Sequence, residues 1–241
     1  MSEENLLRKT FVAAGTVALA FGVAGVAYAQ TPAPSIEATA SVSPTKAGTK
    51  SKPKSEKLKL SVTNNRDSKT TAAKITITMP STLKASTSGL DVCKASDDEL
   101  IASVNVCKKS IAGKGSAHAL VNPFAATPAQ VEFKVVPVVG NKQILFVLTS
   151  PIAQAVLHGK ISGSKLTIPI TPELQQPAPG TFSALLDLST DLSKKKGSKA
   201  LISSVGCKSK KHTIGVSIGY VPNPTPPAQS SASSKADAKC S

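Results

Sequence analysis

Hydrophobic and polar residues alternate along most of the chain from residue 57 onward. In the segment LKLSVT the apolar positions are Leu58, Leu60 and Val62. The same two-residue period occurs in KITITMP, LTIPIT, HTIGVSIGYV and ASSKADAKC, at residues 74–80, 166–171, 212–221 and 232–240. A period of two is typical of a β-strand that buries one face. We therefore expect strands in all of these segments.

Two segments depart from this alternation. QILFVLTS, at residues 143–150, is continuously apolar, which predicts a central strand covered on both faces. VEFKVVPVVG, at residues 131–140, changes phase between Val135 and Val136, just before Pro137. That change predicts a β-bulge or an edge position.

Short polar turns separate about eleven such strands, and no long helical pattern interrupts them. This spacing is typical of sandwiches and barrels. The fold class that we expect is all-β, an antiparallel β-sandwich of immunoglobulin-like or jelly-roll-like type. It would occupy residues 36–241 as one domain, after a linker at residues 30–35.

One short helix is expected between Cys93 and Cys107. Ser96 and Glu99 have the spacing of a capping box, and three consecutive acids suit the first turn of a helix. A metal site is the alternative for these acids. It is disfavoured because neighbouring side chains on one turn point in different directions.

The first 29 residues are predicted to be a signal peptide. An uncharged run of 20 residues ends at Ala27-Tyr28-Ala29, the small-residue pattern that a signal peptidase reads. The run is also long enough to span a bilayer, so an uncleaved anchor is the alternative. Cleavage would leave Gln30 as the mature N-terminus, and the protein would be secreted, extracellular or associated with the cell envelope.

Four cysteines in an exported chain indicate disulfides. Three pairings are possible in principle. The short separation in sequence favours Cys93–Cys107. Closing this loop of 15 residues would contribute ~3 kcal/mol to the free energy of unfolding. We suppose that the strands at residues 200–207 and 212–221 form a hairpin through residues 208–211. If the second of these strands also pairs with the last strand, at residues 232–240, then Cys240 lies opposite about position 209. That register favours Cys207–Cys240.

Lysines give the chain its net charge of +15. After residue 29 there are 26 lysines and one arginine, and aromatic residues are scarce. A nucleic-acid interface would normally include arginines and stacking aromatics, so nucleic acid is not an expected partner. A solvated, lysine-rich surface without a specific ligand is the simpler interpretation of these residues. The functional alternative is weak, salt-sensitive binding to an anionic cell-wall polymer or membrane surface. The candidate contacts are Lys50, Lys52, Lys54, Lys194, Lys195, Lys196, Lys208, Lys210 and Lys211. The last two clusters flank one predicted strand, so we expect them at opposite ends of the fold.

Motifs for catalysis are not apparent. The chain has no G-x-S-x-G and no H-E-x-x-H, and His118, His158 and His212 have no partner identifiable from the sequence. No catalytic residue, cofactor or metal ligand is therefore assigned.

Several segments together resemble a group of secreted, functionally uncharacterised β-sandwich proteins of actinobacteria. They are KAGTKSKPKSEKLKLSVTNN, AAKITITMP, LTIPITPELQQPAPGTFSALLDLSTDL and LISSVGCKSKKHTIGVSIGYVPNP, with two cysteines followed by Gly113-Lys114-Gly115. The related chains often have Cys-Pro at the second cysteine, where this chain has Cys107-Lys108. The resemblance implies secretion and a β-sandwich, and it brings no activity.

The function that we expect is a secreted, non-enzymatic structural or binding module at or near the cell envelope. The alternative is a hydrolase acting on an envelope polymer. A deep cleft lined by a histidine and a carboxylate would favour the hydrolase.

Overall fold

A computed structural model describes residues 33–221 and 231–241, and these residues form one compact unit. The predicted signal peptide, its cleavage point and the first part of the predicted linker lie outside the described residues. Residues 33–35 have no regular structure, and the first strand begins at Ile36.

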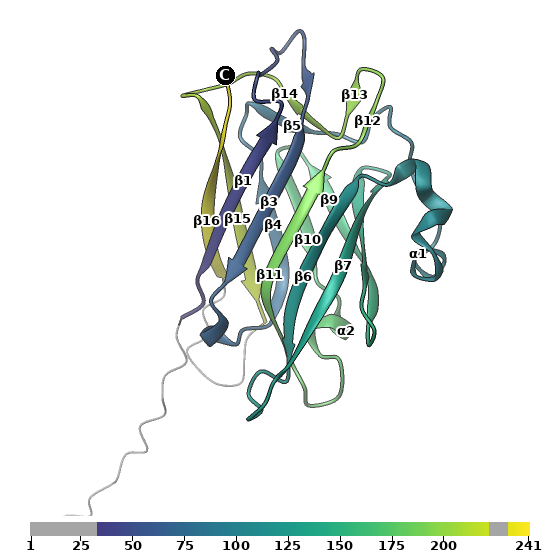
Figure 1. Ribbon diagram of the computed structural model, residues 1–241, viewed down its shortest axis with the longest axis vertical. Coiled ribbons are helices and arrows are strands. Elements are labelled where there is room, and N and C mark those ends of the chain that lie inside the picture. The colour runs from purple at the N-terminus through teal and green to yellow at the C-terminus, as the bar shows by residue number, and fades with distance from the viewer. Residues whose placement is uncertain (1–32, 222–230) are drawn as a thin grey trace, which may run out of the picture. The chain divides into compact units, whose positions relative to one another are not determined.

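Eleven antiparallel strands form one large sheet, which confirms the all-β, antiparallel prediction (Figure 1). In spatial order they are β1 (Ile36–Ser43), β3 (Lys57–Asn64), β11 (Ser183–Leu192), β6 (Gly113–Val121), β7 (Ala129–Gly140), β8 (Gln143–Thr149), β9 (Gln154–Ser162), β10 (Lys165–Pro169), β4 (Ala72–Thr78), β15 (Lys211–Tyr220) and β16 (Ser231–Lys239). The two stacked sheets of a sandwich are not confirmed, because all eleven strands are hydrogen-bonded in one series.

The large sheet curves back on itself, so that its first and last strands, β1 and β16, lie side by side. Beyond the two strands, the Ser241 N–H donates to the Thr45 carbonyl and the Ala47 N–H donates to the Ser241 carbonyl. The sheet therefore approaches a closed barrel. Its interior is filled mainly by aliphatic side chains from the inward-facing positions.

Small elements cover the two ends and one side. A three-stranded sheet consists of β2 (Lys54–Ser55), β14 (Ile202–Ser204) and β5 (Leu83–Ala85), and a hairpin consists of β12 (Lys195–Lys196) and β13 (Lys199–Ala200). The helical elements are η1 (Arg66–Ser68), α1 (Asp97–Ala102), η2 (Val104–Ser110) and α2 (Pro172–Gln175).

The predicted helix and its cap are confirmed. The Ser96 N–H donates to the Glu99 carboxylate at 2.7 Å, and the Glu99 N–H donates to the Ser96 hydroxyl at 3.3 Å. The bond from the Ser96 N–H is the larger cause of a lowered pKa of the Glu99 carboxyl. A second bond, which the Ser96 hydroxyl donates to the same carboxylate at 3.1 Å, lowers that pKa further. The three acidic residues 97–99 thus lie in the first turn of α1, where Glu99 completes the cap.

Helix α1 also accounts for the two departures from alternation. Its Leu100 packs on Leu145 and Val147 of β8, whose opposite face lies in the barrel interior. The prediction of a strand covered on both sides is thus confirmed. Of the two alternatives predicted near Val136, the bulge is wrong, because β7 continues to pair with β8 in unbroken register. On the other side of β7, the ladder with β6 ends at Val135, so Pro137 lies beyond that ladder, next to an isolated bridge between Ile111 and Val138. The apparent phase change arises because Val138, on the outer face of β7, is buried in the same cluster.

A bulge does occur in β11, between Leu185 and Asp187. It lets both Leu185 and Leu188 face the interior. Nearby, β6 approaches β11 so closely that a Cβ on Gly115 would lie 2.2 Å from the Ser189 carbonyl oxygen. Glycine is therefore required at this position of β6, where the backbones of β6 and β11 lie unusually close together.

Candidate functional site

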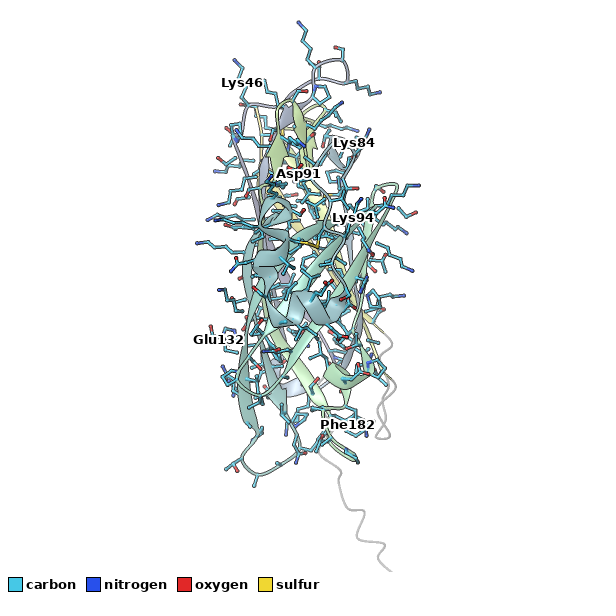
Figure 2. All side chains as sticks on the ribbon, turned by 90° about the vertical axis from the view of Figure 1, so that its right-hand side faces the viewer. Lys46, Lys84, Asp91, Lys94, Glu132 and Phe182 are labelled. Atoms are coloured by element: carbon cyan, nitrogen blue, oxygen red, sulfur yellow. A yellow bond between two sulfur atoms is a disulfide. The ribbon has the colours of Figure 1, made fainter. Side chains whose placement is uncertain are left out.

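Three lysine-rich segments, far apart in the sequence, lie at one end of the large sheet. They are residues 44–54, residues 194–200 with the β12–β13 hairpin, and residues 205–211, and together we call them the basic end. Backbone contacts of neighbouring residues bring them together. Ser204, next to residues 205–211, pairs with Lys54, and the Leu201 N–H donates to Lys194 O at the base of the hairpin. The C-terminus contacts two of the segments, because the Cys240 N–H donates to Lys210 O and the Ser241 N–H donates to Thr45 O. Figure 2 shows Lys46 and Lys84 toward this end and Phe182 at the opposite one.

The expectation that the lysine clusters lie at opposite ends is therefore wrong. The segment 200–207 does not run the length of the sheet. Ala200 ends the short β13, and Ile202–Ser204 forms β14, which pairs with β2 and β5 instead of β15. The hairpin predicted through residues 208–211 is reduced to one bridge between Lys208 and Lys211.

Most candidate lysines at the basic end are available to a ligand. All nine are exposed except Lys54 and Lys194, which are half-buried. Lys196 forms an ion pair with Asp91 at 2.5 Å, and Lys211 forms one with Asp237 at 2.6 Å. The Lys194 ammonium donates to the Lys109 carbonyl oxygen. The other six candidate lysines form no ion pair with a described residue.

Both disulfides have the predicted pairing, Cys93–Cys107 and Cys207–Cys240. The first joins the residues on either side of α1. The second fixes the end of β16 to the basic end. Strand β16 pairs with β15 in a register that aligns Lys211 with Lys239, one residue away from the register predicted from the sequence.

A buried polar cluster lies beneath the basic end. His212 and Glu56 are 0% and 2% exposed, and the His212 Nε2 lies 4.0 Å from a Glu56 carboxylate oxygen. The His212 Nδ1 is hydrogen-bonded to the Thr82 hydroxyl at 2.7 Å. Neither Glu56 oxygen has a hydrogen-bond partner among the described residues, since the nearby Ser204 hydroxyl donates to Gly206 O.

Burial determines the protonation of this cluster. It raises the pKa of Glu56 to about 7, and the proximity of Ser204 offsets part of that rise. It lowers the pKa of His212. Both shifts favour the uncharged forms, as expected for ionisable groups removed from water.

The other two histidines contact carboxylates on the outer surface. The His118 Nδ1 lies 2.8 Å from Asp187, and this hydrogen bond raises the pKa of His118. The His158 Nε2 lies 2.9 Å from Asp97. The sequence does not reveal these pairs, because the bulge in β11 places Asp187 opposite His118 and the packing of α1 brings Asp97 to β9.

The interior of the barrel contains an apolar cavity of about 150 Å³. It opens toward the end opposite the basic end. Three loops there, 122–128, 150–153 and 170–182, contain one charged residue, Glu173, and we call them the apolar end. The adjacent loop 65–71 carries Arg66, Asp67 and Lys69, and the Lys69 ammonium lies 5.6 Å from the centroid of the Phe124 ring. Of the residues that the structure describes, those lining the cavity include Glu173 and none of the three histidines.

Comparisons with known proteins give no assignment. No protein-family model matches this chain. A search of curated proteins also found no match. Residues 33–221 and 231–241 contain no helix long and apolar enough to cross a membrane. The same residues hold no group of three or more His, Cys, Asp or Glu side chains that could bind a metal ion.

Proposed function

We propose that the protein is a secreted, non-enzymatic module of β-sandwich-like type that binds anionic groups of the cell envelope through its basic end. The observation that supports this proposal is the convergence of three lysine clusters at one end of the sheet. Two disulfides are consistent with an oxidising, extracellular environment. The ligand would be a repeating anionic surface, either a wall polymer or acidic lipid.

The chemistry of lysine predicts how this binding behaves. An ammonium is a hydrated point charge without the planar fork that gives arginine fixed bidentate contacts. Binding is therefore sensitive to salt and not selective for one anionic group. Each lysine close to an anionic membrane surface contributes about 1 kcal/mol to the free energy of binding. Clusters at one end can engage together, so their contributions accumulate more than those of separated clusters would.

The hydrolase alternative receives no support from the geometry of the site. The buried pair of Glu56 and His212 is closed to solvent, with exposures of 2% and 0%. The pairs at His118 and His158 lie on outer surfaces of the fold and not in the apolar cavity.

A set of lysine-to-serine variants tests the proposal. Three triple variants change Lys50, Lys52 and Lys54, or Lys194, Lys195 and Lys196, or Lys208, Lys210 and Lys211. Each should lower the sodium chloride concentration at which the protein leaves an anionic wall polymer or vesicles containing acidic lipid. The variant with all nine changes should lose nearly all retention.

The matched control removes three lysines from the sides of the sheet: Lys74, Lys134 and Lys235, all exposed. It loses the same net charge but leaves the basic end intact, so its retention should change much less. Equal loss in the control would show that net charge alone causes binding, and the proposal would be wrong. Retention by the nine-lysine variant would also contradict it.

A further inference from the structure

The apolar cavity is a consequence of small side chains inside a wide sheet. Eight strands give a barrel that side chains just fill, and a wider barrel leaves room for a ligand. Here eleven strands enclose the interior, and alanines occupy lining positions 72, 117, 119 and 153. The chain has no tryptophan and few other aromatic residues to fill the space.

The cavity extends along the strands from the apolar end into the barrel. Its inner end is lined by Thr190 of β11 and Val135 of β7, which are both paired with Gly115 of β6. Toward the apolar end its lining includes Ile152 and Leu174. Ile152 is 71% exposed, although large aliphatic side chains are usually buried.

One polar group in the lining is unpaired. Thr190 is 4% exposed, and its hydroxyl has no hydrogen-bond partner among the described residues. A buried hydroxyl without a partner destabilises the fold, because it has lost its hydrogen bonds to water. An oxygen atom on a bound ligand would satisfy this hydroxyl.

Size and charge limit the class of ligand. A cavity of 150 Å³ compares with an engineered apolar cavity that binds benzene, about six carbon atoms. Glu173 is the charged side chain in the lining that the structure describes, so a carboxylate ligand would meet a like charge and no cation. A longer alkyl chain could leave the cavity past Ile152.

From these observations we propose that the cavity binds an uncharged aliphatic molecule, an alkyl chain of about six or more carbons that carries one hydroxyl or carbonyl oxygen. The oxygen accepts or donates a hydrogen bond at Thr190, and the chain points toward the apolar end. This site lies opposite the basic end and does not depend on the binding of anions there.

Titration of the full exported protein with 1-hexanol, benzene and hexanoate tests the proposal, with methyl NMR signals as the measurement. Saturable shifts should be confined to lining residues such as Ile77 and Val135, and 1-hexanol should bind more tightly than hexanoate. Shifts that spread over exposed residues and never saturate would show that no site exists. Equal or tighter binding of hexanoate would contradict the uncharged class.

Two substitutions test the interior of the site. Thr190→Val keeps the side-chain shape and removes the hydroxyl, so the affinity for 1-hexanol should fall about fivefold, the effect of one neutral hydrogen bond. Its affinity for benzene should stay the same. An equal loss for both ligands would overturn the role of Thr190. Ala119→Leu fills the cavity and should abolish binding of both 1-hexanol and benzene. If that variant does not fold, the smaller change Ala117→Val should weaken binding of both ligands.

A matched pair of surface substitutions tests the opening. Ile152→Ser should weaken binding of 1-decanol more than that of 1-hexanol, because only the longer chain reaches this residue. Val106→Ser changes a residue that is 58% exposed and outside the cavity, and it should change neither. If Val106→Ser weakened 1-decanol as much as Ile152→Ser, the proposed path of the chain would be wrong.

Discussion

The buried carboxyl of Glu56 should make the protein less stable as the pH rises toward neutrality. Folding raises the pKa of Glu56 from its ordinary value of 4.5 to about 7. Between these values the folded protein keeps a proton that the unfolded chain has lost. The stability that this proton gives to the folded state is therefore fully present below pH 4.5, and it is lost as the pH rises through about 7. This difference corresponds to about 3 kcal/mol.

The substitution Glu56→Gln isolates this effect, because glutamine has the shape of the protonated acid and does not ionise. We expect the free energy of unfolding of the variant, relative to the wild type, to increase by about 3 kcal/mol between pH 4.5 and pH 8. Burial of His212 acts in the opposite direction, since its lowered pKa removes stability as the pH falls below 6.5. Both proteins retain that histidine, so their difference reports mainly on Glu56.

Urea unfolding at a series of pH values is the measurement. Glu37→Gln, at an exposed position of β1, is the matched control and should follow the wild-type curve at every pH. If the Glu56→Gln and wild-type curves ran parallel from pH 4.5 to pH 8, the carboxyl would not hold a proton in the folded state, and the reasoning from burial would fail.

Four other predictions concern the stability of the fold and the N-terminus of the exported protein. Replacing Cys207 with serine should lower the free energy of unfolding by about 4 kcal/mol, the chain-entropy value for a loop of its length, measured by urea unfolding. Gly115→Ala should destabilise the fold by more than about 2 kcal/mol, because its Cβ would overlap a carbonyl oxygen of β11; a smaller effect in the same assay would show that β6 can move. Ser96→Ala should cost about 1 kcal/mol through loss of the helix cap. N-terminal sequencing of the exported protein should begin at Gln30, and an intact Met1 would indicate an anchor instead.

Local patterns in the sequence predicted the elements well. Alternation identified strands such as β15, and the Ser96–Glu99 spacing identified the start of α1. The error at Val136 shows the limit of alternation. A second layer on the outer face buries residues there and makes an unbroken strand look as if its phase had changed.

The sites depended on long-range contacts that local patterns do not contain. The lysines were visible, but their common location follows from β14 pairing with β2 and β5. The buried pair had a signal that could have been read. Glu56 continues the inward positions of Leu58 and Leu60, and His212 continues those of Ile214, so extending each alternation by one step places both groups in the interior. The cavity was not predictable, because its size depends on how far the sheet closes.

The contact between β1 and β16 also determines when the fold can be completed. It joins strands from opposite ends of the described chain, so the contacting residues are far apart in sequence. Such a contact has a high cost in loop-closure entropy and is expected to form slowly. Until residues 231–241 are available, β15 and β1 each present an open strand edge, which can pair with another chain. A chain in which β16 is not yet paired therefore has a higher risk of aggregation than the complete fold. The disulfide between Cys207 and Cys240 fixes the end of β16 beside the start of β15, so it helps to keep β16 in position against β1.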